Sequence, residues 1–157
     1  MSNSDAMKRK DTPIGLLLAQ TAKAVSRVFD ETLAAAGGAM PTWLVLKALM
    51  QGGHRSQSEL ARDIGIQGPT LTHHLNAMEK AGLLTRRRLP DNRRVHQVEL
   101  TDRGRAMFHQ LRRAALEHDA RLRQDFSAEE IELLRGLLGR LADNVRASEA
   151  RDRQENA

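Results

Sequence analysis

Two short helical segments separated by a glycine turn, with a charged hairpin directly behind them, occupy the middle of the sequence. Residues 56–59 (Ser-Gln-Ser-Glu) have the pattern of a capping box, which opens a brief helix that turns at Gly65. Gly68-Pro69 opens the next helix, whose apolar residues recur at helical spacing until Gly82, a residue suited to the left-handed position beyond a helix end. The spacing therefore predicts a helix-turn-helix unit.

A β-hairpin is predicted immediately after this unit. Residues 83–89 and 95–100 have strand composition, and Pro90-Asp91-Asn92 supplies the turn between them. Five arginines and one aspartate lie within residues 86–94, in a chain whose net charge is +5. Because most of the positive excess is concentrated in this one stretch, it favours a polyanionic partner.

Longer helical stripes flank this centre. Thr12 is expected to cap a helix that begins at Pro13 and ends at Gly37-Gly38, and residues 41–52 predict a shorter second helix. Thr101 is expected to cap a fifth helix, and a second capping box at 127–130 opens the last one. The three outer helices carry more apolar surface than a small domain covers, which predicts a two-fold dimer. A monomer whose long helices fold back over the domain is the alternative.

The composition excludes several classes of protein. Cysteine is absent, which rules out disulfides, thiolate metal sites and thiol redox chemistry. The chain has no apolar run of membrane-spanning length and no signal-peptide core at its polar N-terminus, so we expect a cytoplasmic protein without a membrane partner. No nucleophile–base–acid cluster, phosphate loop or paired carboxylate indicates an enzyme, and no cofactor or metal site is expected.

The chain resembles the MarR-type multiple-antibiotic-resistance regulators over about residues 13–146. The resemblance to their helix-turn-helix lies in Leu60-Ala61, Ile64-Gly65, Leu71-Thr72, Leu75, Met78-Glu79 and Gly82-Leu83-Leu84. The resemblance to their wing motif lies in Asp91-x-Arg93 followed by Val98-x-Leu100-Thr101-Asp102-x-Gly104.

This resemblance implies a mainly α fold with a small β-hairpin. A winged helix-turn-helix lobe at 41–100 is expected between dimerisation helices at 12–38 and 101–146, with a disordered arm at 1–11 and a frayed charged tail at 147–157. It also implies a homodimer that represses transcription from a pseudo-palindromic operator in double-stranded DNA. Release by a small effector, often a phenol or an aromatic acid, is implied as well.

The helix that opens at Gly68 is the expected recognition helix, because side chains near the N-terminus of such a helix reach base edges. Thr70 and His73 are the first choices for base contacts, and Ser56 is expected to contact phosphate. The expected contact residues of the two helices are Ser56, Gln67, Thr70, Thr72, His73, His74 and Asn76. His73 and His74 stand where the family commonly has arginine. Because histidine carries little charge near neutral pH, the affinity for DNA is expected to rise as the pH falls.

The hairpin is expected to supply affinity rather than sequence selection. Arg93 and Arg94 lie at its tip, where they are expected to reach a neighbouring minor groove. Asp91 is expected to fix the tip by accepting hydrogen bonds from Arg93 or from the turn backbone. Arg86 and Arg88 share one face of the strand and are also expected to contact DNA. Arg87 takes the other face, so the three arginines cannot all contact DNA equally.

A ligand pocket is implied by the resemblance between the first two helices, the fifth helix and the DNA-binding lobe. Its expected walls are Phe29, Met40, Trp43 and Met107, while Arg27 and His54 are expected to meet a carboxylate; each of these also fits plain core or surface.

Two other functions remain open. A metal-responsive regulator would draw on His109 and His118, but their spacing of nine residues puts them on opposite helix faces. A non-specific architectural DNA-binding protein is the other alternative.

Overall fold

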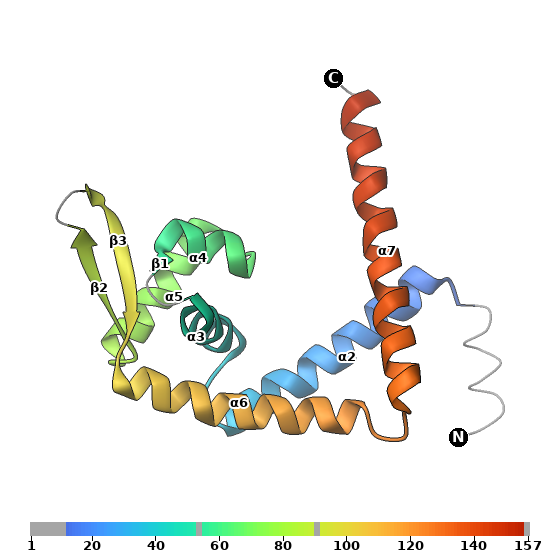
Figure 1. Ribbon diagram of the computed structural model, residues 1–157, viewed down its shortest axis with the longest axis horizontal. Helices are drawn as coiled ribbons and strands as arrows, with labels where there is room; N and C mark the ends of the chain where they lie inside the picture. Colours follow the sequence, from blue (N-terminus) through green and yellow to red (C-terminus); the bar gives the residue numbers. More distant parts are fainter. Residues whose placement is uncertain (1–11, 53–54, 90–91, 156–157) are drawn as a thin grey trace. The chain divides into compact units, whose positions relative to one another are not determined.

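The computed structural model describes residues 12–52, 55–89 and 92–155, with the backbone alone at 55, 88–89, 92–96 and 155. Its elements are α2 (Ile14–Ala35), α3 (Met40–Gly52), β1 (Arg55–Ser56), α4 (Gln57–Ile64), α5 (Gly68–Lys80), β2 (Leu84–Leu89), β3 (Asn92–Leu100), α6 (Asp102–Leu122) and α7 (Ala128–Glu155) (Figure 1). This order confirms the expected mainly α fold with a hairpin after a helix-turn-helix. The predicted arm at 1–11 lies outside the described residues.

The chain divides into two compact units, Met1–His118 and Asp119–Ala157. In the first unit α3 lies at the centre and contacts α2, α4, α5 and β3 (Figure 1). Its buried core draws one or more side chains from each of these elements and from β2 and α6: Leu33, Val45, Leu46, Ala48, Leu49, Leu60, Leu71, Leu75, Met78, Leu83, Leu84, Val98 and Leu111. The core therefore joins the helix-turn-helix, the hairpin and the flanking helices of this unit into one body.

The hairpin belongs to a three-stranded antiparallel sheet in the order β1-β3-β2. Within it Arg86 pairs with Val98 and Arg87 pairs with Gln97, and the register shifts between Arg88 and Leu89. The additional strand β1, which pairs Arg55 with Val98, was not predicted. Two residues are too few to produce an alternating pattern in the sequence.

The helix ends follow the local signals of the sequence. Gly65 and Gly82 adopt φ values of +67° and +70°, which glycine reaches without steric cost. After α5 the backbone N–H of Leu83 donates to the Met78 carbonyl and that of Gly82 donates to the Glu79 carbonyl, both at 2.9 Å, as in a Schellman motif. One expectation differs, since Pro13 rather than Thr12 occupies the N-cap position of α2. Its carbonyl accepts the first helical hydrogen bond, from Leu17, at 3.0 Å.

Both predicted capping boxes are confirmed. At the start of α4 the N–H of Glu59 donates to the Ser56 hydroxyl at 3.2 Å, and the Glu59 carboxylate accepts from the Ser56 N–H at 2.9 Å. At the start of α7 the same reciprocal bonds join Ser127 and Glu130, at 3.2 and 2.8 Å. Each box satisfies backbone donors that the first turn of a helix leaves free.

Thr101 connects the hairpin, α5 and α6. Its hydroxyl accepts a hydrogen bond from the Gly104 N–H at 3.0 Å, which makes it the predicted cap of α6. The same hydroxyl donates to the Gly82 carbonyl at 2.7 Å, and the Thr101 N–H donates to the Leu83 carbonyl at 3.2 Å. The end of the recognition helix is thereby tied to the start of α6.

In the second unit α7 continues through Glu155. The predicted frayed tail from residue 147 is therefore helical as far as 155, where good helix formers such as alanine, glutamate and arginine are frequent. Ion pairs one turn apart, Arg146 with Asp143 at 2.7 Å and Arg153 with Glu149 at 3.9 Å, support this charged end. Among the described residues no single helix is long and apolar enough to span a membrane, although the pair α2 and α3, bent by 78°, passes that test jointly.

Candidate nucleic-acid interface

The recognition helix α5 has one buried and one exposed face. Leu71, Leu75 and Met78 are buried in the core. Gln67, Thr70, His73 and Asn76 are exposed, as expected for side chains that meet a ligand from outside. The helix begins at Gly68 with Pro69 in its first turn, so its free backbone N–H groups lie next to Gln67 and Thr70. A helix N-terminus with these properties favours phosphate.

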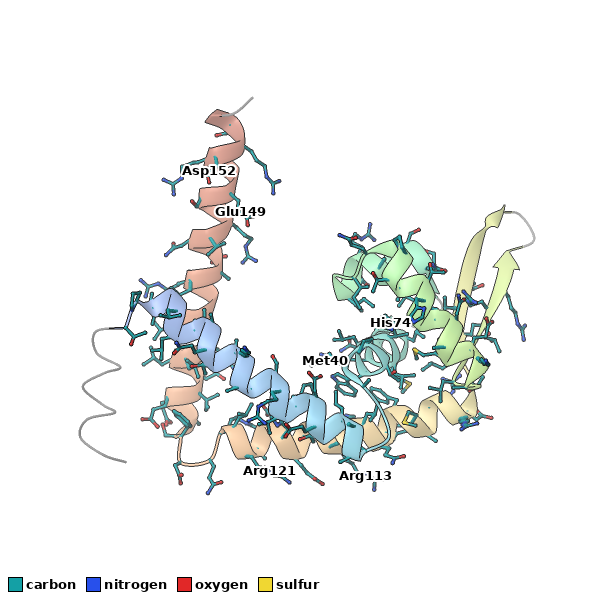
Figure 2. All side chains as sticks on the ribbon, turned by 180° about the vertical axis from the view of Figure 1, so that it is seen from behind. Met40, His74, Arg113, Arg121, Glu149 and Asp152 are labelled. Atoms are coloured by element: carbon teal, nitrogen blue, oxygen red, sulfur yellow. The ribbon has the colours of Figure 1, made fainter. Side chains whose placement is uncertain are left out.

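Thr72 and His74 lie at the sides of this face and are half-buried. The Thr72 hydroxyl donates to the Gly68 carbonyl at 2.9 Å and also receives a hydrogen bond from the Gln57 side chain. This contact joins the first turn of α4 to α5, so Thr72 braces the helix-turn-helix. The His73 and His74 rings meet edge to face with centroids 5.9 Å apart, and Figure 2 labels His74 on α5.

Arg86 on β2 is held by two residues of α5. Its guanidinium donates to the Glu79 carboxylate through Nε at 3.0 Å and through Nη2 at 2.6 Å, and Nη2 also donates to Asn76 Oδ1 at 2.6 Å. The Arg86 N–H donates to the other Glu79 oxygen at 3.1 Å. The Arg86 side chain is only 18% exposed. Its hydrogen bonds therefore join the hairpin of β2 and β3, which is the wing, to the recognition helix α5.

The remaining predicted residues of the wing divide into three groups. Arg87 takes the opposite face from Arg86, as expected, and is exposed. Arg88, Arg93 and Arg94 belong to the described backbone, but their side chains do not belong to the described atoms. Asp91 lies outside the described residues, so its predicted role as a brace stays a prediction.

Ser56 has both its hydroxyl functions occupied in the capping box. The hydroxyl donates to Glu59 Oε2 at 2.9 Å while it accepts from the Glu59 N–H. A phosphate that bound to this hydroxyl would compete with the Glu59 carboxylate. The neighbouring Glu59 therefore makes Ser56 a less favourable phosphate ligand.

Two residues that support this interface, Gln57 and Glu79, were not predicted from the sequence. Glu79 is three residues beyond Asn76 on the same side of a helix, and a basic hairpin follows it within ten residues. This spacing could have predicted the contacts of Arg86 with Glu79 and Asn76. Gln57 carries no comparable signal, because its contact with Thr72 depends on the angle between two helices.

The apolar members of the predicted ligand set are packed against other parts of the first unit, whereas Arg27 is exposed. Phe29 stacks on His118 with ring centroids 5.0 Å apart, and Trp43 stacks on Phe108 at 5.7 Å. Met40, labelled at the start of α3 in Figure 2, and Met107 pack against the core. Arg27 forms an ion pair with Glu31 at 2.7 Å. His54 lies outside the described residues.

The histidines considered for a metal lie in different environments. His109 is exposed, whereas His118 is buried with no hydrogen-bond partner for its Nε2 atom. The described part of the chain contains no group of three His, Asp or Glu side chains placed to hold a metal ion. An open cavity in the second unit, lined in part by Arg123, Phe126 and Arg135, includes none of the predicted ligand residues.

Comparison with known proteins matches this chain to transcriptional regulators. The MarR family model matches residues 39–96, which include α3 to α5, β2 and much of β3. An uncharacterised HTH-type transcriptional regulator of Bacillus subtilis, YdgJ, is 32% identical over 106 residues, a match that covers 68% of this chain and 65% of that protein. The chain thus aligns with slightly less than two thirds of the length of this relative.

Solved structures match over more of the chain. The transcriptional repressor CouR, bound to a 23-mer DNA duplex, is 30% identical with a TM-score of 0.76, and the match covers 83% of this chain and 92% of that one. A probable transcriptional regulator from Pseudomonas aeruginosa is also 30% identical, with a TM-score of 0.74 and coverages of 83% and 98%. A mutant of Escherichia coli MarR in complex with operator DNA shares the fold at 22% identity and a TM-score of 0.75, with coverages of 84% and 95%.

Proposed function

Because the chain belongs to the MarR family of transcriptional regulators, we propose that it is a repressor that binds a pseudo-palindromic operator in double-stranded DNA as a homodimer. The observation that carries the proposal is the exposed polar face of α5, with an arginine-rich hairpin beside it. Such a protein acts where the chromosomal DNA is, which for a bacterial regulator is the cytoplasm.

In the proposed complex α5 lies in the major groove. Gln67, Thr70 and His73 project from its exposed face toward base edges, and the N-terminus of the helix lies against a phosphate. Arg87 and the arginines of the wing tip bind the backbone and the adjacent minor groove. The structure of CouR, at 30% identity, is a complex with a 23-mer DNA duplex, which supports duplex DNA as the ligand.

The proposed dimer is supported by apolar side chains that the single chain leaves in water. In the first unit, α2 exposes Ile14, Leu16 and Leu18. In the second unit, α7 exposes Leu133, Leu134, Leu137, Leu138 and Val145, most of which follow one helical stripe. Surfaces of this kind are typical of interfaces between identical chains, and a two-fold axis is the commonest way to cover them.

Release by a small aromatic ligand is the second part of the proposal. The two stacked pairs, Phe29 on His118 and Trp43 on Phe108, connect α6 with α2 and α3. An aromatic acid that replaced one ring of a stack would change how α6 packs on the lobe that carries α5. Titration of the protein–DNA complex with benzoates and phenols tests this, with Trp43→Leu as the variant expected to lose the response.

The central experiment is the sequencing of genomic fragments that the purified protein binds. We expect a palindromic site, bound at least about a thousandfold more tightly than scrambled DNA at the same salt concentration. Equal affinity for both DNAs would instead identify a non-specific architectural protein. Metal analysis of the same preparation addresses the metal-responsive alternative, which a stoichiometric ion would support.

A further inference from the structure

We propose that Arg86 is a positioning residue that fixes the Asn76 side chain as a hydrogen-bond donor toward DNA. The proposal rests on the proposed function, because it assigns to one side chain of the recognition helix the kind of atom that it contacts. Asn76 is exposed on α5, on the same side of the helix as His73, while Arg86 approaches it from β2.

The contact determines which end of the Asn76 amide faces Arg86. An asparagine amide has one accepting oxygen and one donating nitrogen, whereas a guanidinium group can only donate. The partner of Arg86 Nη2, at 2.6 Å, is therefore Asn76 Oδ1. Since the oxygen and nitrogen of an amide point in different directions, the Nδ2 group is turned away from Arg86.

Glu79 keeps this orientation from relaxing. Its carboxylate accepts hydrogen bonds from Arg86 Nε, Nη2 and the backbone N–H, at 3.0, 2.6 and 3.1 Å. The Arg86 side chain is 18% exposed, so water competes weakly for its donors. Charge-assisted hydrogen bonds of this geometry are stronger than neutral ones. Turning the amide around would place two sets of donors against each other.

A donor-only Asn76 has a defined chemical preference in DNA. The usual asparagine contact to adenine is bidentate and needs both the oxygen and the nitrogen at one base edge. With Oδ1 held by Arg86, that contact is disfavoured. The Nδ2 group instead suits an acceptor, such as a phosphate oxygen, thymine O4 or the N7 and O6 edge of guanine. Guanine is favoured over adenine because adenine places its N6 donor beside the N7 acceptor.

The experiment measures the affinity of the full-length protein for its selected operator and for all single-base variants of that operator. Asn76→Ala identifies the contact. Loss of discrimination at one base pair assigns it to a base, and an equal loss for every sequence assigns it to phosphate. If Asn76 contacts a base (the base arm of the experiment, as opposed to the phosphate arm), we expect the wild type to prefer guanine to adenine at that pair by roughly tenfold.

Arg86→Met then tests the positioning role. The freed amide can rotate, so in the base arm we expect the preference for guanine over adenine at that pair to fall to about twofold or less. In the phosphate arm, we expect Arg86→Met to lose as much affinity as Asn76→Ala for every sequence. Arg86→Lys also carries only donors, so it should restore the wild-type pattern, which a general loss of structure would not permit.

Arg87→Met is the matched control, because it makes the same chemical change one residue away on the opposite face of β2. It should weaken binding at low salt without a change in base preference. A wild-type preference for adenine at the Asn76 base pair would overturn the proposal, as would an Arg86→Met variant with unchanged preference and affinity. If the wild type shows no sequence preference at all, the proposed function itself fails.

Discussion

The backbone of Gly104 in α6 lies against the carbonyl group of Leu83, so close that a Cβ atom on Gly104 would overlap the carbonyl oxygen and lie 3.0 Å from the carbonyl carbon. The same Leu83 carbonyl accepts a hydrogen bond from the Thr101 N–H. This close approach sets the distance between the end of the recognition helix and the start of α6.

A methyl group at this position should therefore destabilise the protein. We expect Gly104→Ala to lower the free energy of unfolding by about 3 kcal/mol, because the obstacle is backbone that cannot rotate away. Urea denaturation followed by circular dichroism measures the change. Gly15→Ala in α2 is the control, since nothing lies within 4 Å of the added Cβ. Equal stability of the two variants would contradict the proposed role of the junction.

The wing tip should contribute to affinity through charge. Replacing Arg93 and Arg94 by alanine should weaken binding to all DNA sequences and reduce the slope of log affinity against log salt by about two units. The physical reason is that each phosphate neutralised by an arginine releases condensed counterions. Binding measured between low and high salt gives the slope, and an unaltered slope would remove the tip from the interface.

The apolar stripe of α7 should mediate self-association. Leu138→Glu places a charge within the stripe, and we expect it to weaken the dimer by about 3 kcal/mol, because a carboxylate buried without a partner is strongly unfavourable. Ala147→Glu adds the same group on the opposite side of the helix and should leave the dimer intact. Sedimentation equilibrium distinguishes the two. A soluble dimer that lacks residues 127–157 would contradict this assignment of the interface.

Much of the fold could be predicted because its signals are local. The capping boxes at Ser56 and Ser127 and the left-handed glycines Gly65 and Gly82 connect atoms only a few residues apart. Steric limits on the backbone and unsatisfied helix ends therefore determine them with little help from the rest of the chain. The spacing of Leu71, Leu75 and Met78 indicated the buried face of α5 for the same reason.

Contacts between elements were predicted less well. The strand β1 depends on a pairing of Arg55 with Val98, more than forty residues away. The brace between Gln57 and Thr72 depends on how α4 crosses α5. Neither leaves a periodic pattern in the sequence, because the energy of such a contact depends on where the remaining chain places the two partners.

Arg86 shows most clearly which properties follow from the sequence and which depend on the tertiary structure. The sequence by itself determined that a positively charged hairpin follows a helix-turn-helix, because charge and turn propensity belong to the residues themselves. Only the tertiary structure decided that Arg86 faces α5, where Glu79 and Asn76 occupy its donors, while Arg87 remains exposed. The physical reason is that hydrogen bonding and desolvation of a charge depend on the distance to groups from other elements, which packing alone establishes.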